Sequence, residues 1–194
     1  MYTLIGSVKT RAARAVWLLE ELGLPFTHIA AGPRSAEALA QNPAGKVPVL
    51  LAEGQTITDS TAILTYLADK HGAFTAAPGT IARAQQDSLT HFILDEFDAL
   101  LWTAARHSFV LPVEHRLPAI KEPLRWELAR SQQTLITRMG APYLMGEAPT
   151  VPDFILAHCL GWATAAKFDI TEPRLHDYLT QMRARPAYAR TMAR

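Results

Sequence analysis

The sequence of 194 residues predicts a small α/β domain followed by an all-helical domain. Before about residue 75, short apolar runs that are typical of strands alternate with segments of helical periodicity. Beyond that point no segment has the alternation of a strand, and long helical patterns fill the chain. Residues 71–79 separate the two parts and consist mostly of small residues that end in Pro-Gly, as linkers often do.

The first predicted strand covers residues 2–5, and the first predicted helix covers residues 11–22. Apolar residues recur at helical spacing in that helix, and Gly23 follows it at the position of a C-terminal cap. Residues 26–30 form the next predicted strand. Because a strand-helix-strand crossover is right-handed and joins parallel strands, we expect these two strands to pair in parallel.

A short helical stretch leads to a third predicted strand at residues 47–52. The turn signal Gly54-Gln55 then allows residues 56–58 to return antiparallel as an edge strand. A helix predicted at residues 60–70 completes the α/β part. The order of elements is therefore β-α-β, a short helical stretch, and β-β-α.

The second part predicts four helices, at residues 81–107, 124–139, 151–166 and 175–183. The third of them has a clear start signal: Thr150 at the N-cap, Pro152 in the first turn and Asp153 at the third helical position. This pattern is typical of a capping box, so we interpret these residues as structural.

The composition excludes several classes of protein. Lys and Arg number 19 against 18 Asp and Glu, so the net charge of +1 gives no sign of a nucleic-acid partner. The single cysteine, Cys159, rules out an intrachain disulfide, a dithiol redox centre and a cysteine zinc cluster. The seven histidines show no metal-ligand spacing, and we expect no metal.

The N-terminal stretch lacks the basic start, apolar run and cleavage site of a signal peptide. The longest apolar stretches are much shorter than a membrane span. The sequence therefore predicts a cytoplasmic protein that does not enter a membrane.

Residues 42–50, with the sequence Asn-Pro-Ala-Gly-Lys-Val-Pro-Val-Leu, form the most informative loop. X-Pro bonds are where cis peptides occur, and a cis bond at Val47-Pro48 would turn the N–H and C=O of Val47 outward. An extended peptide could then pair with these groups as a short strand. The alternative is an ordinary turn before an edge strand.

A second candidate site precedes the helix at residues 60–70. Asp59 or Ser60 can cap this helix. Alternatively, the free N–H groups at the helix start attract a carboxylate while Asp59 attracts an ammonium, which together would hold an α-amino-acid group.

A third candidate site joins the first strand to the first helix, at the end of a parallel strand where open α/β sheets place ligands. Ser7 and Thr10 supply hydroxyl donors there, and Lys9 and Arg11 supply positive charge. The alternative interpretation makes Thr10 an N-cap and leaves the two cations on a solvated face.

Taken together, these features resemble the cytosolic glutathione transferases, of a bacterial kind with a serine or threonine active site. Four segments carry the resemblance in the family's order: residues 13–26, the loop at 42–50, Asp59 to Ile63, and Thr150 to Asp153. The resemblance implies a thioredoxin-like domain at residues 1–73, a linker at 74–79, and a helical domain at 80–194 that contributes the second-substrate pocket.

The resemblance also implies a homodimer with glutathione as co-substrate. By match, Val47 would bind the cysteinyl backbone of glutathione, with Pro48 as the cis-proline. Asp59 and Ser60 would bind the γ-glutamyl group. Lys46 would lie alongside the tripeptide.

The residue that activates the thiol departs from the family pattern. Members of the family use Tyr, Ser or Cys after the first strand, and neither Tyr nor Cys stands in the matching place here. A strict register puts Lys9 there, whereas a shift of one residue brings in Thr10. We rank Thr10 first as the activating hydroxyl, Ser7 second, and Lys9 as an electrostatic helper.

The function implied is attack of the glutathione thiolate on an electrophilic, mostly apolar small molecule bound between the domains. Candidate lining residues lie near Trp102, Arg106, His107 and Phe109, although helix packing would explain them as well. Two alternatives stay open: a glutathione-binding or interaction protein without efficient catalysis, and a glutathione-dependent isomerase or dehalogenase.

Overall fold

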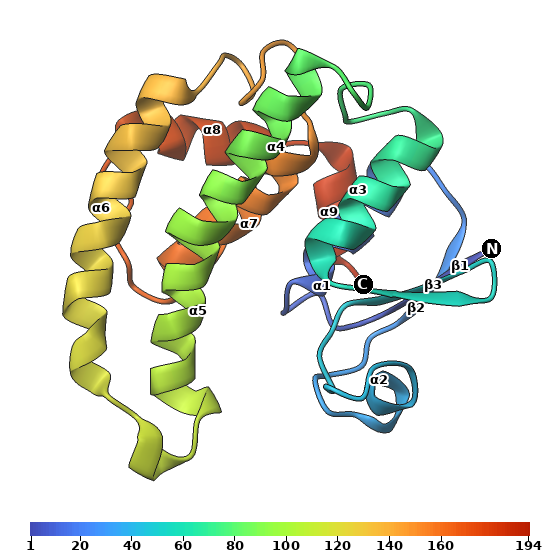
Figure 1. The fold of residues 1–194 in the computed structure, drawn as a ribbon, viewed down its shortest axis with the longest axis horizontal. Helices are drawn as coiled ribbons and strands as arrows, with labels where there is room; N and C mark the ends of the chain where they lie inside the picture. The colour runs from blue at the N-terminus through green and yellow to red at the C-terminus, as the bar shows by residue number, and fades with distance from the viewer. The chain divides into compact units, whose positions relative to one another are not determined.

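The computed structural model describes residues 1–194, and its contacts divide the chain into two compact units. The first comprises Met1–Thr80 together with Met182–Arg194, and the second comprises Ile81–Gln181. Figure 1 shows their elements. The fold class is confirmed: a thioredoxin-like sheet of four strands with helices is followed by a helical part.

The sheet of the first unit has the strand order β2-β1-β3-β4. Its strands are β1 (Tyr2–Ile5), β2 (Phe26–Ile29), β3 (Val49–Ala52) and β4 (Gln55–Thr58). β1 pairs with β2 in parallel, as predicted, and β3 runs antiparallel to both β1 and β4. β3 begins two residues later than expected, since Val47 and Pro48 belong to the preceding loop.

Four helices accompany this sheet: α1 (Ala12–Glu21), α2 (Ala36–Gln41), α3 (Ser60–His71) and α9 (Pro186–Met192). α1 packs against α3, and Figure 1 shows α2 on the opposite side of the sheet. Fully buried Leu4, Val16, Leu50 and Ile63 form part of the core that holds these layers together. Helix α9 was not predicted; it begins at a proline and packs against α1.

The second unit is helical throughout. Its main helices are α4 (Ile81–Ile93), α5 (Ala99–Ala105), α6 (Lys121–Arg138), α7 (Val151–Ala165) and α8 (Pro173–Arg183). The single helix expected at residues 81–107 is interrupted by a π-helical turn at Leu94–Asp98, and a second π-helical turn at Arg106–Val110 extends it. Two short 3-10 turns, Val113–His115 and Pro118–Ile120, lead into α6.

The predicted capping box at the start of α7 is present. Asp153 accepts hydrogen bonds from the Thr150 amide at 2.7 Å and from the Tyr178 hydroxyl at 2.9 Å. Burial raises the pKa of the Asp153 carboxyl, although these hydrogen bonds act in the opposite direction. The box therefore holds a buried carboxylate in the core of the helical unit, which supports its structural interpretation.

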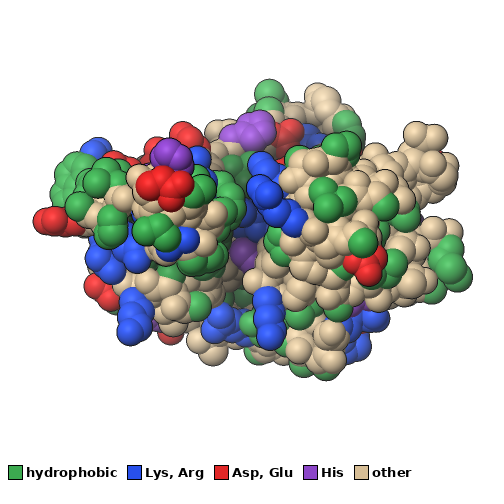
Figure 2. Space-filling view, turned by 90° about the horizontal axis from the view of Figure 1, so that it is seen from below, with side chains coloured by type: hydrophobic (Ala, Val, Ile, Leu, Met, Phe, Trp, Pro, Cys, Tyr) green, Lys and Arg blue, Asp and Glu red, His purple; other side chains and the backbone are tan.

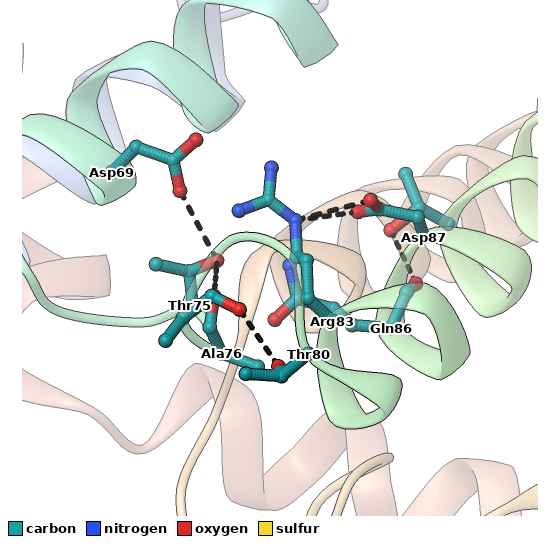
Figure 3. Close-up of polar contacts among 9 residues, drawn as sticks. Asp69, Thr75, Ala76, Thr80, Arg83, Gln86 and Asp87 are labelled. Carbon is teal, nitrogen blue, oxygen red and sulfur yellow. Dashed lines mark hydrogen bonds and ion pairs between the residues drawn. The ribbon is translucent and has the colours of Figure 1, made fainter.

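Local polar contacts lie on both sides of residue 80 (Figure 3). In the segment after α3, Thr75 donates to the carbonyl of Ala76 at 3.2 Å, and Thr80 donates to the carbonyl of Ala77 at 2.7 Å. In the first turns of α4, Arg83 forms an ion pair with Asp87 at 2.9 Å. The contacts of Thr75 and Thr80 involve the segment predicted to be a linker, residues 74–79, whereas the ion pair lies within α4.

Charged side chains on the face in Figure 2 are scattered among apolar and uncharged ones. This mixed surface agrees with the near-balance of acidic and basic residues in the sequence. None of the helices combines the length and the hydropathy that crossing a bilayer requires.

Candidate functional site

The turn after β1 continues along the end of β2. The amide of Gly6 donates to the carbonyl of Ile29 at 2.9 Å, and the amide of Ser7 donates to the carbonyl of Ala31 at 2.8 Å. Main-chain bonds thus fix the first residues of the turn before α1 begins at Ala12.

Gly6 brings this turn against the loop at residues 42–48. A Cβ on Gly6 would lie 2.6 Å from the Cβ of Ala12 and 3.2 Å from the Cβ of Val47. Its φ of +145° is also in the region that favours glycine. Only glycine therefore permits the close approach of this turn, residues 6–11 (the Ser7 turn), to Val47. Two of the three predicted sites thereby come together.

The hydroxyls of this turn differ in what they bind. Thr10 Oγ1 donates to the carbonyl of Ser7 at 2.7 Å and accepts from the amide of Ala12 at 3.2 Å. Ser7 Oγ accepts from the amide of Lys9 at 3.3 Å and donates to no protein acceptor. The Thr10 hydroxyl is thus engaged in shaping the turn, while the Ser7 hydroxyl keeps its hydrogen for another acceptor. The Lys9 side chain is exposed.

The loop at residues 42–48 has the geometry that the sequence suggested. The Val47-Pro48 peptide bond is cis, and the strand ladder starts only at Val49. Asn42 orders the loop, because its side chain donates to the carbonyl of Lys46 at 3.0 Å and accepts from the amide of Ala44 at 3.1 Å. Val47 consequently lies outside the ladder and next to the Ser7 turn.

The start of α3 provides a third set of groups. Asp59 caps the helix, with Oδ1 accepting from the amides of Thr61 at 2.8 Å and Ala62 at 3.1 Å. Asp59 has φ +73° and ψ 128°, a conformation rarely adopted by residues other than glycine. These contacts leave Asp59 Oδ2 and the amide of Ser60 for a ligand. Capping and ligand binding are therefore compatible at this residue.

Arg14 lies beside the third set of groups, although no sequence pattern singled it out. Its side chain is 1% exposed, and its guanidinium donates to Ser60 Oγ at 3.3 Å. A buried cation beside the start of α3 adds positive potential where a carboxylate would bind. The available signal was its position between Ala12 and Ala15, which are both buried apolar residues of α1, but an arginine on a helix is ordinarily taken to be solvated.

The residues proposed for the second substrate lie together on one helical stretch. Trp102 is on α5, and Arg106, His107 and Phe109 follow it in the π-helical turn. Arg106 donates to Thr103 at 3.2 Å, and Phe109 is 69% exposed.

The helical unit also has an open groove of about 590 Å³. Its lining includes Leu89, Arg138 and Met145, and none of the proposed second-substrate residues borders it. No group of three or more His, Cys, Asp or Glu side chains is arranged to hold a metal ion.

Comparison with known proteins agrees with this geometry. Residues 10–70 match the sequence model of the family described as glutathione S-transferase, N-terminal domain. A glutathione S-transferase of Pseudomonas putida is 29% identical over 190 residues, which cover 90% of this chain and 83% of that protein. The chain is thus similar to glutathione S-transferases along most of its length, and residues 10–70 match the N-terminal domain of that family.

Solved structures of glutathione transferases have a similar fold. The crystal structure of a glutathione transferase from Methylococcus capsulatus is 29% identical, with a TM-score of 0.84 over 100% of this chain and 98% of that one. A glutathione transferase of Phanerochaete chrysosporium, in complex with oxidized glutathione, is 24% identical, with a TM-score of 0.81 over 99% and 94% of the two chains. The second likeness is evidence for the fold alone.

Proposed function

We propose that the first unit binds glutathione and that the chain acts as a glutathione S-transferase, with the glutathione thiolate as nucleophile. The observation that carries this proposal is the close approach of the Ser7 turn to the cis Val47-Pro48 bond. A cysteinyl residue paired with the main chain of Val47 would have its sulfur next to the Ser7 hydroxyl. The match of residues 10–70 to the glutathione S-transferase N-terminal domain supports glutathione as the ligand.

The γ-glutamyl end of glutathione would lie at the start of α3. Its ammonium would bind Asp59 Oδ2, and its carboxylate would accept from the amide and hydroxyl of Ser60. The helix dipole and the buried Arg14 guanidinium both favour a negative charge at this place. Lys46 remains a proposed contact for the rest of the tripeptide, because its side chain is exposed at the edge of the loop.

The pKa of the glutathione thiol must be lowered before the thiol is mostly ionised at neutral pH. A thiol of pKa near 8.5 is only about 3% thiolate at pH 7. Lowering its pKa by ~2 units requires about 2.7 kcal/mol in favour of the anion. A helix N-terminus contributes roughly 0.3–1 kcal/mol and one hydrogen bond to a charged group roughly 1.5–3 kcal/mol. The start of α1 and one hydroxyl donor are therefore sufficient.

We propose Ser7 as that donor, ahead of Thr10, which reverses the order expected from the sequence. The free hydrogen of Ser7 supports this choice, because Thr10 would have to give up its bond to the Ser7 carbonyl. Lys9 would act only through its charge, since its side chain is exposed.

A paired substitution tests the donor. In Ser7→Ala, the pKa of bound glutathione should rise by about 1–2 units and turnover near neutral pH should fall roughly tenfold to a hundredfold. Turnover should partly recover at high pH, where the thiol ionises unaided. Thr10→Ala should lower stability and change the thiol pKa less. The reverse pattern would identify Thr10 as the donor, and a normal pH profile in both variants would point to main-chain N–H groups.

We further propose that residues 1–73 bind glutathione and that residues 80–194 supply the pocket for an electrophilic, mostly apolar substrate. Trp102 and the π-helical turn after it are the proposed lining. Replacing Phe109 with Ala should alter KM for the electrophile while leaving KM for glutathione unchanged. A change only in KM for glutathione would contradict this assignment.

A homodimer is the proposed assembly. The apolar side chains that remain exposed, among them Ile81 at 76% and Trp126 at 61%, are consistent with a partner. Light scattering at micromolar concentration should give twice the chain mass of 21.4 kDa. A monomeric mass would contradict it.

A further inference from the structure

The peptide unit that joins Gly6 to Ser7 is held on both sides by β2 and the residues after it. Its N–H, from Ser7, donates to the carbonyl of Ala31 at 2.8 Å. Its carbonyl, from Gly6, lies 2.8 Å from Nε2 of His28. Because a carbonyl oxygen only accepts, this bond requires the hydrogen of the imidazole on Nε2.

We propose that His28 is a positioning residue for thiol activation. This inference rests on the proposed function, because the residue that His28 would orient is Ser7, the proposed donor. His28 touches neither the thiol nor the tripeptide in this proposal. It acts by fixing the plane of the peptide from which the Ser7 side chain projects.

The turn needs such a support because its first residue is a glycine. Gly6 has no Cβ and adopts a φ of +145°, so its own conformational preferences restrain the peptide plane weakly. The bond to Ala31 fixes one edge of that plane, and the bond from His28 fixes the other. A displacement of the hydroxyl by a fraction of an ångström would weaken its hydrogen bond to the thiolate, since such bonds depend steeply on geometry.

The register of the sheet explains how His28 reaches this carbonyl. His28 pairs with Leu4 in the parallel ladder of β1 and β2, and its ring reaches the carbonyl of Gly6, two residues beyond Leu4 and just past the end of β1. Phe26 lies on the same face of β2, with ring centroids 6.5 Å apart. The imidazole is thus half-buried on an edge strand, directly behind the turn.

A merely structural role would also account for a histidine that satisfies a buried carbonyl. The two roles differ in their consequences. A structural role affects unfolding alone, whereas a positioning role also changes the ionisation of bound glutathione. The test therefore measures both.

The experiment compares His28→Leu, which removes the donor, with His28→Gln, which keeps an N–H donor of similar reach. His71→Leu is the matched control, because His71 bonds an exposed tyrosine hydroxyl, that of Tyr2, away from the turn. We expect His28→Leu to lower kcat about threefold to tenfold and to raise the pKa of bound glutathione by about 0.5–1 unit. KM for glutathione should change less than about twofold, and His28→Gln should restore most of kcat.

Hydrogen exchange of the unliganded proteins provides a readout that does not depend on glutathione. In His28→Leu, amides of residues 6–10 should exchange faster while those at the start of α3 stay unchanged. Unchanged exchange there, an unchanged thiol pKa, or a Gln variant as poor as the Leu variant would overturn the proposal. A wild-type protein that forms no thiolate of bound glutathione would instead refute the proposed function, and exchange would still report whether His28 holds the turn.

Discussion

The two ends of helix α1 are held by different kinds of contact. At the N-terminal end, main-chain groups and the hydroxyls of Ser7 and Thr10 make the hydrogen bonds of the turn. At the C-terminal end, the carboxylates of Glu20 and Glu21 receive arginines from the last residues of the chain. Bonds to charged groups contribute roughly 1.5–3 kcal/mol and neutral ones about 0.5–1.5 kcal/mol, so the C-terminal end is the firmer anchor.

Glu21 is the centre of this anchor. Arg185 donates to both of its carboxylate oxygens, at 2.6 and 2.8 Å, in the bidentate arrangement typical of strong pairs. The indole N–H of Trp17 donates to the same carboxylate at 3.0 Å, and the Tyr188 ring meets Trp17 edge-on at 4.9 Å. The Glu21 side chain is 8% exposed, so this network is sheltered from water.

Glu20 adds a second, more exposed pair of contacts. Arg190 Nε lies 2.8 Å and Arg194 Nε 2.7 Å from its carboxylate. Arg190 also donates to the main-chain carbonyl of Glu20 at 2.9 Å, which satisfies a carbonyl at the helix end. Residues remote in sequence therefore stabilise the C-terminal end of α1. The turn before its N-terminal end keeps a hydroxyl hydrogen, that of Ser7, without a protein acceptor.

Deleting residues 184–194 should destabilise the C-terminal end of α1 more than any single substitution. The deletion removes α9 and leaves two partly buried carboxylates without their arginines, each loss costing several kcal/mol. We expect Tm to fall by about 10 °C or more, with fast hydrogen exchange in the second half of α1. A truncated protein with nearly wild-type Tm would show that the sheet and α3 alone hold the helix.

Glu21→Gln isolates the bidentate pair. The substitution removes the charge but keeps the shape, so we expect a loss of about 1–3 kcal/mol in the free energy of unfolding. The exposed helical Glu127→Gln is the control, and it should change stability by less than about 0.5 kcal/mol. Equal losses of stability in the two variants, measured by denaturant unfolding, would show that the Glu21–Arg185 pair contributes no more than an exposed glutamate. The C-terminal end of α1 would then not be the firmer anchor.

Asp59 allows capping and ligand binding to be separated at the start of α3. Asp59→Ala should cost about 1 kcal/mol of stability through loss of the cap. It should also weaken glutathione binding about tenfold to a hundredfold, because a charged contact disappears. Asp59→Asn retains the cap but not the charge, so its stability should stay near wild type while affinity falls. Calorimetry showing unchanged affinity in Asp59→Asn would remove the carboxylate from the proposed site.

The sequence predicts the part of the fold that local patterns encode. Strand alternation, helical periodicity and the capping box at Thr150 and Asp153 give nearly all elements, because each signal lies within a few residues. The proline in the 42–50 loop likewise permits a cis bond at a predictable place. The shared geometry of Val47 and the Ser7 turn depends on Gly6 and becomes visible only when the strands are paired.

Local sequence patterns do not predict contacts between residues that are far apart in the chain. Helix α9 is short, and its role depends on glutamates more than 160 positions earlier in the chain. Arg14 is buried only because the start of α3 lies beside it. His28 on its own is one of seven histidines without a pattern, and the carbonyl that it binds is 22 residues away. The Thr10 hydroxyl is engaged by the main chain of its own turn, which the residue type does not reveal.

Acidification should weaken the C-terminal anchor by a smaller amount. Burial raises the pKa of the Glu20 carboxyl, but hydrogen bonds from Arg190 and Arg194 outweigh it, so the net pKa lies below its ordinary value of 4.5. A carboxylate with a lowered pKa in the folded state contributes stability that is fully present above pH 4.5 and is lost as the pH falls through the folded pKa. The difference in Tm between wild type and Glu20→Gln should therefore be about 1–3 °C near neutral pH and shrink below about pH 4. The difference in Tm between wild type and Glu127→Gln should not change with pH. If the difference between wild type and Glu20→Gln also stayed constant with pH, the arginines would act on the main-chain carbonyl rather than on the carboxylate.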